Sequence, residues 1–487
     1  TRGVLIGAAL IALCLCAALA LIGAGAAYFY YSSRGAITRP PIISVPTALP
    51  LPTSPTLPPP SPTGGVTPAA GDATPAVGEA TRAMLAAIEQ QVIALRGLQP
   101  SGKFELRFTT PDEYKLKTKG DFETDYSPEE AVDDARVLHA LGLLPANFDL
   151  YNFYIDLYSE QILGSYDPKT KELYVIKASG KIGGVERQTY AHEFNHALQD
   201  ENYDMRSLGL SDDACERDTE RCAAIRALVE GDSTLLESQW LKRYGTTQDY
   251  ADIGEYYSNY TSTAYDRAPC YLRDDFYWPY DDGLKFVQGL YDSGGWAAVD
   301  DAYRRPPVST EQIMHPKLYK SGDIPEMIPA PVLTDTLGAG WRQIDSNVMG
   351  EWYTRLILLE PFRNSDPQSS DYCKVKSRDS DRMTKAAAGW GGDAYVVSYD
   401  ESTAQTALVL LTTWDTETDA REFEDAFKPY GKARFKTSPQ AHGQGSCWDA
   451  GDSGVSCLIR RGSDTLWVIA PDEGMVDRIV GTIPPFG

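Results

Sequence analysis

Apolar side chains recur at intervals of three and four positions in several segments of this chain, and such intervals predict amphipathic helices. The first segment is residues 79–98, where Met84, Ile88, Val92 and Leu95 follow this spacing. A second begins at Ser127, which forms a capping box with Glu130. Two more helices are predicted over residues 185–200 and 222–244. We therefore expect a mainly helical domain over residues 79–345.

Short runs of β-branched and aromatic residues predict strands in two other regions. The runs "ILGSY" and "ELYVI" in residues 160–180 flank a turn-forming sequence, Asp167 to Lys171, and predict a β-hairpin. From about residue 383 the pattern indicates strand, strand, helix, hairpin and strand. The expected fold class is α+β, with a small C-terminal α+β accessory domain over residues 346–487.

The N-terminus has a different composition. Residues 4–31 form an uncharged run of 28 residues, and about 20 are enough to cross a bilayer. A cleaved signal peptide is the alternative, but the run is long for one and no A-x-A site follows. We therefore predict a transmembrane anchor over residues 1–35. Residues 36–78, rich in Pro and Thr, are predicted to be a disordered linker of polyproline character.

Charge and cysteine content narrow the classes of function. The net charge of −23 argues against nucleic-acid binding, because phosphate backbones are bound by clustered Lys and Arg. Six cysteines lie beyond the anchor, at positions 215, 222, 270, 373, 447 and 457. Their even number and two close-spaced pairs predict disulfides in an oxidising compartment, with unpaired core thiols as the alternative. Together with the anchor, they predict a single-pass cell-membrane protein whose folded part is extracellular.

The segment "HEFNH", residues 192–196, contains two of the five histidines in the chain. An H-E-x-x-H match arises by composition alone in well under about one chain in a hundred. On the predicted helix His192 and His196 are about 40° apart, with Glu193 on the same side. Both imidazoles can therefore reach one cation from a single helix face.

A third ligand is expected from the next helix. Glu230 lies in an apolar setting, "ALVEGDS", and a buried carboxylate is costly unless it is paired or binds a metal. Glu237, two turns further along, is the alternative. Two histidines and a carboxylate are a typical Zn²⁺ ligand set that leaves one position open for water. Asp200 is expected either to orient a ligand or to be solvated at its helix end.

These segments are similar to those of a known family. "HEFNHALQD" resembles the active-site helix of zincin metallopeptidases, and the later "ALVEGD" resembles the third-ligand helix of their gluzincin, thermolysin-like branch. The metzincin branch fits less well, because no third histidine closely follows His196. The resemblance covers about residues 150–320, and "ALVEGDS" departs from the N-E-x-x-S-D form of thermolysin.

The resemblance implies a zincin-like fold and assigns roles to residues. His192, His196 and Glu230 would bind Zn²⁺, and Glu193 would be the general base for the metal-activated water. An edge strand upstream of the zinc helix, "QILGSY" or "ELYVI", would pair with an extended peptide substrate. His315, at the end of a short helix that Ser309 and Gln312 cap, would stabilise the oxyanion; a structural role is its alternative.

The sequence therefore predicts a membrane-anchored extracellular zinc peptidase that acts on peptide or protein substrates, or a related metal-dependent amide hydrolase. The alternative is a non-catalytic surface or adhesion protein on a metallopeptidase-like scaffold. Retention of both histidines, Glu193 and a third ligand favours the enzyme. The two histidines His139 and His442 are expected to be a helix residue and an exposed loop residue.

Overall fold

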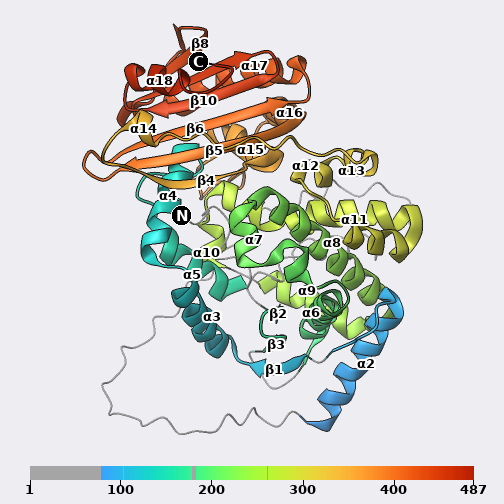
Figure 1. Ribbon diagram of the computed structural model, residues 1–487. Coiled ribbons are helices and arrows are strands. Elements are labelled where there is room, and N and C mark those ends of the chain that lie inside the picture. The colour runs from blue at the N-terminus through green and yellow to red at the C-terminus, as the bar shows by residue number, and fades with distance from the viewer. Residues whose placement is uncertain (1–77, 103, 162, 178–181, 260–261, 487) are drawn as a thin grey trace, which may run out of the picture.

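The computed structural model describes residues 78–486, except for residues 103, 162, 178–181 and 260–261. The predicted anchor, residues 1–35, and nearly all of the predicted linker lie outside these residues. No helix in the described part of the chain is long and apolar enough to cross a membrane. The fold is α+β, as predicted: a helical part with a small sheet adjoins a seven-stranded sheet (Figure 1).

The helices predicted from apolar spacing are present. The helical part contains α2 (Glu79–Arg96), α3 (Pro111–Asp125), α4 (Pro128–Leu141), α5 (Leu150–Gln161), α6 (Gly184–Tyr203), α7 (Asp212–Arg217), α8 (Thr219–Tyr244), α9 (Thr247–Asn259), α10 (Thr263–Asp266), α11 (Cys270–Arg304), α12 (Thr310–Met314) and α13 (Pro316–Ser321). Ser127 and Glu130 form the expected capping box at the start of α4. His139, also in α4, is a partly buried helix residue, as predicted.

The small sheet has three strands in the order β1-β3-β2. The predicted hairpin is confirmed, because β2 (Gly164–Asp167) and β3 (Glu172–Ile176) pair antiparallel. Strand β1 (Glu105–Thr109), which the sequence analysis missed, adds to β3 in parallel. Strand β3 is therefore central, and β2 is the edge strand of the two that the hairpin supplies.

Helices α8 and α11 cross at two glycines. A Cβ atom at Gly231 would overlap the carbonyl oxygen of Gly283, and one at Gly283 would overlap that of Ala227. The two backbones therefore pack against each other directly. The aromatic segment 256–305 contributes to this packing, and its buried members include Tyr271, Trp278 and Phe286.

We predict that Gly283→Ala destabilises the protein by about 1–3 kcal/mol, because overpacking forces the two helices apart. Gly289→Ala in the same helix is the matched control: no atom lies within 4 Å of its added Cβ. Because alanine is more favourable than glycine in a helix interior, the control should gain about 1 kcal/mol in free energy of unfolding. The free energy of unfolding in urea measures both effects, and equal values for the two variants would contradict the crossing.

The seven-stranded sheet is antiparallel throughout, in the order β4-β5-β6-β10-β9-β8-β7. Its strands are β4 (Trp341–Asn347), β5 (Trp390–Asp400), β6 (Gln405–Trp414), β7 (Gln440–His442), β8 (Gly445–Asp449), β9 (Val455–Arg461) and β10 (Asp464–Ala470). Helices α15 (Gly350–Leu359), α16 (Ser377–Ala387) and α17 (Glu417–Phe435) pack in the core between the sheet and the helical part, whereas α14 (Thr334–Leu337) and α18 (Glu473–Val480) cover the other face.

Successive residues of these strands alternate between two cores. Tyr395 and Val397 of β5 belong to the large core that continues into the helical part, whereas Val396 belongs to the core under α18. The C-terminal sheet therefore shares a hydrophobic core with the domain before it. Strand β4 also runs across the expected boundary between residues 345 and 346.

The six cysteines form three disulfides, Cys215–Cys222, Cys270–Cys373 and Cys447–Cys457. The disulfide prediction is confirmed, and the alternative of unpaired thiols was wrong. The expectation for His442 was also wrong: it ends strand β7, and its Nε2 atom lies 2.8 Å from Asp477 Oδ1. His442 pairs with Gly445 of β8 in a local hairpin. Asp477, by contrast, comes from α18, which is distant in sequence.

Candidate metal centre

The centre of the helical part consists of two helices that are buried on all sides. Every residue of α6 from Gln188 to Asp200 is buried, and so is every residue of α8 from Ala227 to Glu237. Both stretches contain several polar and charged side chains. Because buried polar groups are costly without partners, each of them needs a hydrogen bond, an ion pair or a ligand.

The side chains predicted to bind metal converge between these helices. His192 Nε2 and His196 Nε2 are 3.0 Å apart. Glu230 Oε2 lies 3.4 Å from each of these two nitrogens. Among the described residues, these three form the group of His, Cys, Asp or Glu side chains close enough to hold one metal ion.

The spacing suits a tetrahedral Zn²⁺ site. Ligand atoms about 2.0–2.1 Å from a tetrahedral ion lie roughly 3.3–3.4 Å from one another. The three measured separations, 3.0, 3.4 and 3.4 Å, are close to this value. Two neutral nitrogens and one carboxylate oxygen also match the ligand types that zinc prefers.

The other nitrogen of each histidine ring faces a hydrogen-bond acceptor. His192 Nδ1 lies 2.9 Å from Glu237 Oε2, and His196 Nδ1 lies 2.7 Å from Gln199 Oε1. The amide nitrogen of Gln199 donates to the carbonyl of Val229, which turns its oxygen toward the ring. With a proton on each Nδ1, the rings would keep both Nε2 lone pairs for an ion bound between them and Glu230.

These contacts give the two candidate ligand acids of α8, Glu230 and Glu237, different positions. Glu230 faces the Nε2 atoms of both rings, whereas Glu237 faces Nδ1 of His192 alone. Gln188 donates a hydrogen bond to the second oxygen of Glu237 and so holds that carboxylate in place. Of the two candidate third ligands, only Glu230 lies on the Nε2 side of both rings.

The buried charges adjust the pKa values of the site. Burial alone would raise the pKa of Glu230, but the charge of His196 and the hydrogen bond with His192 lower it to about 2. Burial alone would lower the pKa of His192, but its hydrogen bonds with Glu230 and Glu237 raise it to about 10. The Glu230 carboxylate is therefore ionised at neutral pH.

The side chain of Glu193, on α6, packs against the start of the edge strand β2. This side chain is fully buried, and its Cγ atom would lie 3.2 Å from a Cβ atom added to Gly164 in β2. The same added Cβ would approach Thr189 Cγ2 to 2.5 Å, so a larger residue at position 164 would push the strand away from α6. Glycine therefore allows the start of β2 to pack directly over Glu193.

One prediction about a neighbouring residue was wrong, and one residue near the site was missed. Asp200 neither orients a ligand nor is solvated: its buried carboxylate accepts hydrogen bonds from Tyr166 and Lys171, and so ties the hairpin to α6. The preceding residue, Gln199, faces the His196 ring instead. Tyr280 was not singled out by the sequence, but its ring centroid lies 6.4 Å from that of His192.

His315 is held at a different place. Its Nε2 atom lies 2.9 Å from Glu351 Oε1 in α15, and this acid raises the pKa of His315. Residues of α12 contact the first turn of α8, where Glu220 accepts a hydrogen bond from Thr310. Glu230 lies ten residues further, about 15 Å along the helix. The converging group consists of His192, His196 and Glu230, and the oxyanion role of His315 stays a prediction.

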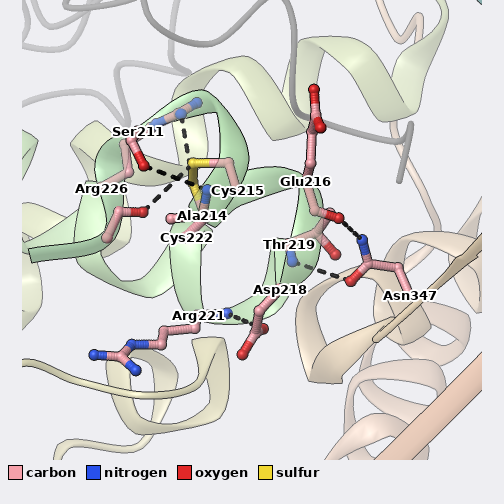
Figure 2. Close-up of a disulfide and its surroundings, with 11 residues drawn as sticks. Ser211, Ala214, Cys215, Glu216, Asp218, Thr219, Arg221, Cys222, Arg226 and Asn347 are labelled. Atoms are coloured by element: carbon pink, nitrogen blue, oxygen red, sulfur yellow. Dashed lines mark hydrogen bonds between the residues drawn. A yellow bond between two sulfur atoms is a disulfide. The ribbon is translucent and has the colours of Figure 1, made fainter. Parts of the chain in front are cut away.

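The first turn of α8 is anchored by the C-terminal sheet and by a disulfide (Figure 2). Cys215 of α7 is bonded to Cys222 of α8. Asn347, at the end of β4, accepts a hydrogen bond from the backbone N–H of Thr219 and donates one to the carbonyl of Glu216. Because α8 carries Glu230, these contacts connect the sheet to the helix that supplies the third convergent side chain.

Comparison with known proteins concerns the C-terminal sheet. Residues 336–480 match the model of a domain of unknown function, DUF8575. The matched range begins just before β4 and ends with α18, so it contains the whole seven-stranded sheet. No curated protein and no solved structure matches the chain.

Proposed function

We propose that this protein is a zinc-dependent peptidase of the zincin type, gluzincin branch. The observation that carries the proposal is the convergence of His192 Nε2, His196 Nε2 and Glu230 Oε2 at 3.0–3.4 Å, with both Nδ1 atoms facing acceptors. Such a donor set at such spacing is expensive to bury without a cation. A bound zinc compensates for that cost.

Each residue has a role in this proposal. His192, His196 and Glu230 hold the ion, and Glu237 and Gln199 orient the two rings. When bound, zinc with an open position lowers the pKa of a water ligand and polarises a carbonyl. Glu193 accepts the proton of the attacking water and passes it to the leaving amine, and its burial beside β2 keeps bulk water away from that transfer.

The substrate in this proposal is an extended peptide. Strand β2 is one of the two edge strands of the small sheet in the described part of the chain, and it begins directly over Glu193. A peptide that pairs with the outer edge of β2 would add a fourth strand and place a backbone carbonyl near the site.

The proposed location is the extracellular face of the cell membrane. Three disulfides support an oxidising compartment. The apolar segment within residues 1–35 would anchor the chain, and the Pro-rich residues 36–78 would separate the enzyme from the bilayer.

Metal removal tests the proposal. We expect the purified protein to carry about one zinc per chain. Treatment with a chelator should abolish cleavage of a quenched fluorescent peptide library, and added Zn²⁺ should restore it. Elemental analysis and the cleavage assay measure the two quantities on the same sample.

The outcomes separate the two candidate functions. Zinc content without cleavage, at any pH and with any library, would favour a binding protein on a metallopeptidase-like scaffold. A native protein that carries no zinc and takes up none would contradict the metal site itself.

A further inference from the structure

The buried side chain of Arg96, at the end of α2, pairs with acids from two other helices. This side chain has no exposed area. The guanidinium forms a bidentate ion pair with Asp232 of α8, with Nε 2.9 Å from Oδ1 and Nη2 3.0 Å from Oδ2. Its Nη1 atom bonds Asp300 of α11 at 2.7 Å.

Asp232 connects this ion pair to the metal-binding helix. It lies two residues after Glu230, and its Oδ1 atom also accepts a hydrogen bond from Asn195, 3.3 Å away. Asn195 lies in the "HEFNH" segment directly before His196. The same amide donates to Ser233 Oγ at 3.0 Å, and Ser233 Oγ lies 3.2 Å from His196 Nδ1.

Helix α2 contacts both ligand helices at further points. Tyr190 of α6 donates a hydrogen bond to Glu89 at 2.6 Å, and Trp240 of α8 donates one to Gln91 at 2.9 Å. Leu85, Ile88 and Val92 of α2 are buried in the shared core. Helix α2 therefore packs against both α6 and α8. The relative position of these two helices sets the distance between Glu230 and the two imidazole rings.

We infer that Arg96 is a positioning residue of the metal centre, and that α2 is thereby part of the site. The inference rests on the proposed function. A planar guanidinium binds a carboxylate through two parallel bonds, which fixes orientation as well as distance. Through Asp232, Asn195 and Ser233, that fixed geometry holds Glu230 Oε2 against the Nε2 atoms of His192 and His196.

Arg96→Lys tests the geometry separately from the charge, because lysine keeps the positive charge beside Asp232 but cannot form the bidentate ion pair. Arg363→Lys is the matched control: the side chain of Arg363 is only 5% exposed and also pairs with two acids, Asp274 and Glu360, and neither of these belongs to α6 or α8. Both variants are made in the full chain.

Zinc affinity, measured by competition with a chelator, is the first readout. Arg96→Lys should weaken binding about tenfold, as loss of an outer-shell partner does. Arg363→Lys should leave the affinity unchanged. Equal affinities for Arg96→Lys and the wild type would overturn the inference, as would an equal loss in both variants, since that would indicate general destabilisation.

Hydrogen exchange of the metal-free proteins is the second readout, and it does not depend on zinc. Arg96→Lys should speed exchange in residues 190–197 and 228–236, but not in β9 or β10. If the wild type binds no zinc, the proposed function fails, and this measurement alone decides the inference. Unchanged exchange in those two segments would then overturn it.

Discussion

Glu193→Gln is expected to lower kcat/KM for peptide cleavage by about 10²–10⁴-fold, which is the usual contribution of a general base. The amide has the size of the carboxylate but cannot accept the proton of the attacking water. Because Glu193 is not among the three convergent donors, the variant should retain about one zinc per chain. Steady-state kinetics and elemental analysis of the same preparation measure both results.

A control for this variant lies on the same helix. Glu201→Gln changes a partly exposed acid two turns further along α6, and it should leave the kinetics unchanged. Full activity in Glu193→Gln would mean that another group accepts the proton. Loss of zinc from that variant would instead place Glu193 among the ligands, against the geometry.

Glu230→Gln is expected to abolish zinc retention and, with it, all cleavage. The amide oxygen has no negative charge to offset the ion, and a site with two nitrogen donors alone binds weakly. Glu237→Gln, which changes an acid on the same helix in the same way, should lower zinc affinity by only about 10–100-fold. Titration of both variants with Zn²⁺ against a competing chelator measures the difference.

This pair of variants decides between the two acids that the sequence left open. Equal losses in zinc affinity would mean that Glu237 also binds the metal. A reversed order, with Glu237→Gln losing zinc and Glu230→Gln retaining it, would contradict the arrangement in which Glu230 faces both Nε2 atoms.

The positions of Glu230 and Glu237 also help to explain how α6 and α8 can bury polar side chains in the centre of the protein. Each ring nitrogen of His192 and His196 lies close to an oxygen atom, and each of those oxygens belongs to α6 or α8. The side chains that surround them come from α2, α9 and α11, which exclude water from the two helices. Low polarity around the site strengthens every electrostatic contact within it.

The sequence alone determined those features that depend on local geometry. A four-residue spacing on a helix brings His192 and His196 to one face whatever the rest of the fold does. In the same way, the Ser127 capping box, the β2–β3 hairpin and the two close-spaced cysteine pairs follow from residues within a few positions of one another.

Only the tertiary structure decided the features that depend on how distant segments pack. Glu230 and Glu237 lie two turns apart on the same face of α8, so the position of α8 along its own axis decides that Glu230 faces the Nε2 atoms. The close approach of Gly231 to Gly283 and the ion pair between Arg96 and Asp232 are long-range contacts at this level of the helix. The wrong expectation for Asp200 arose because its partners come from the hairpin. No local pattern specifies such contacts, since they join residues that are far apart along the chain.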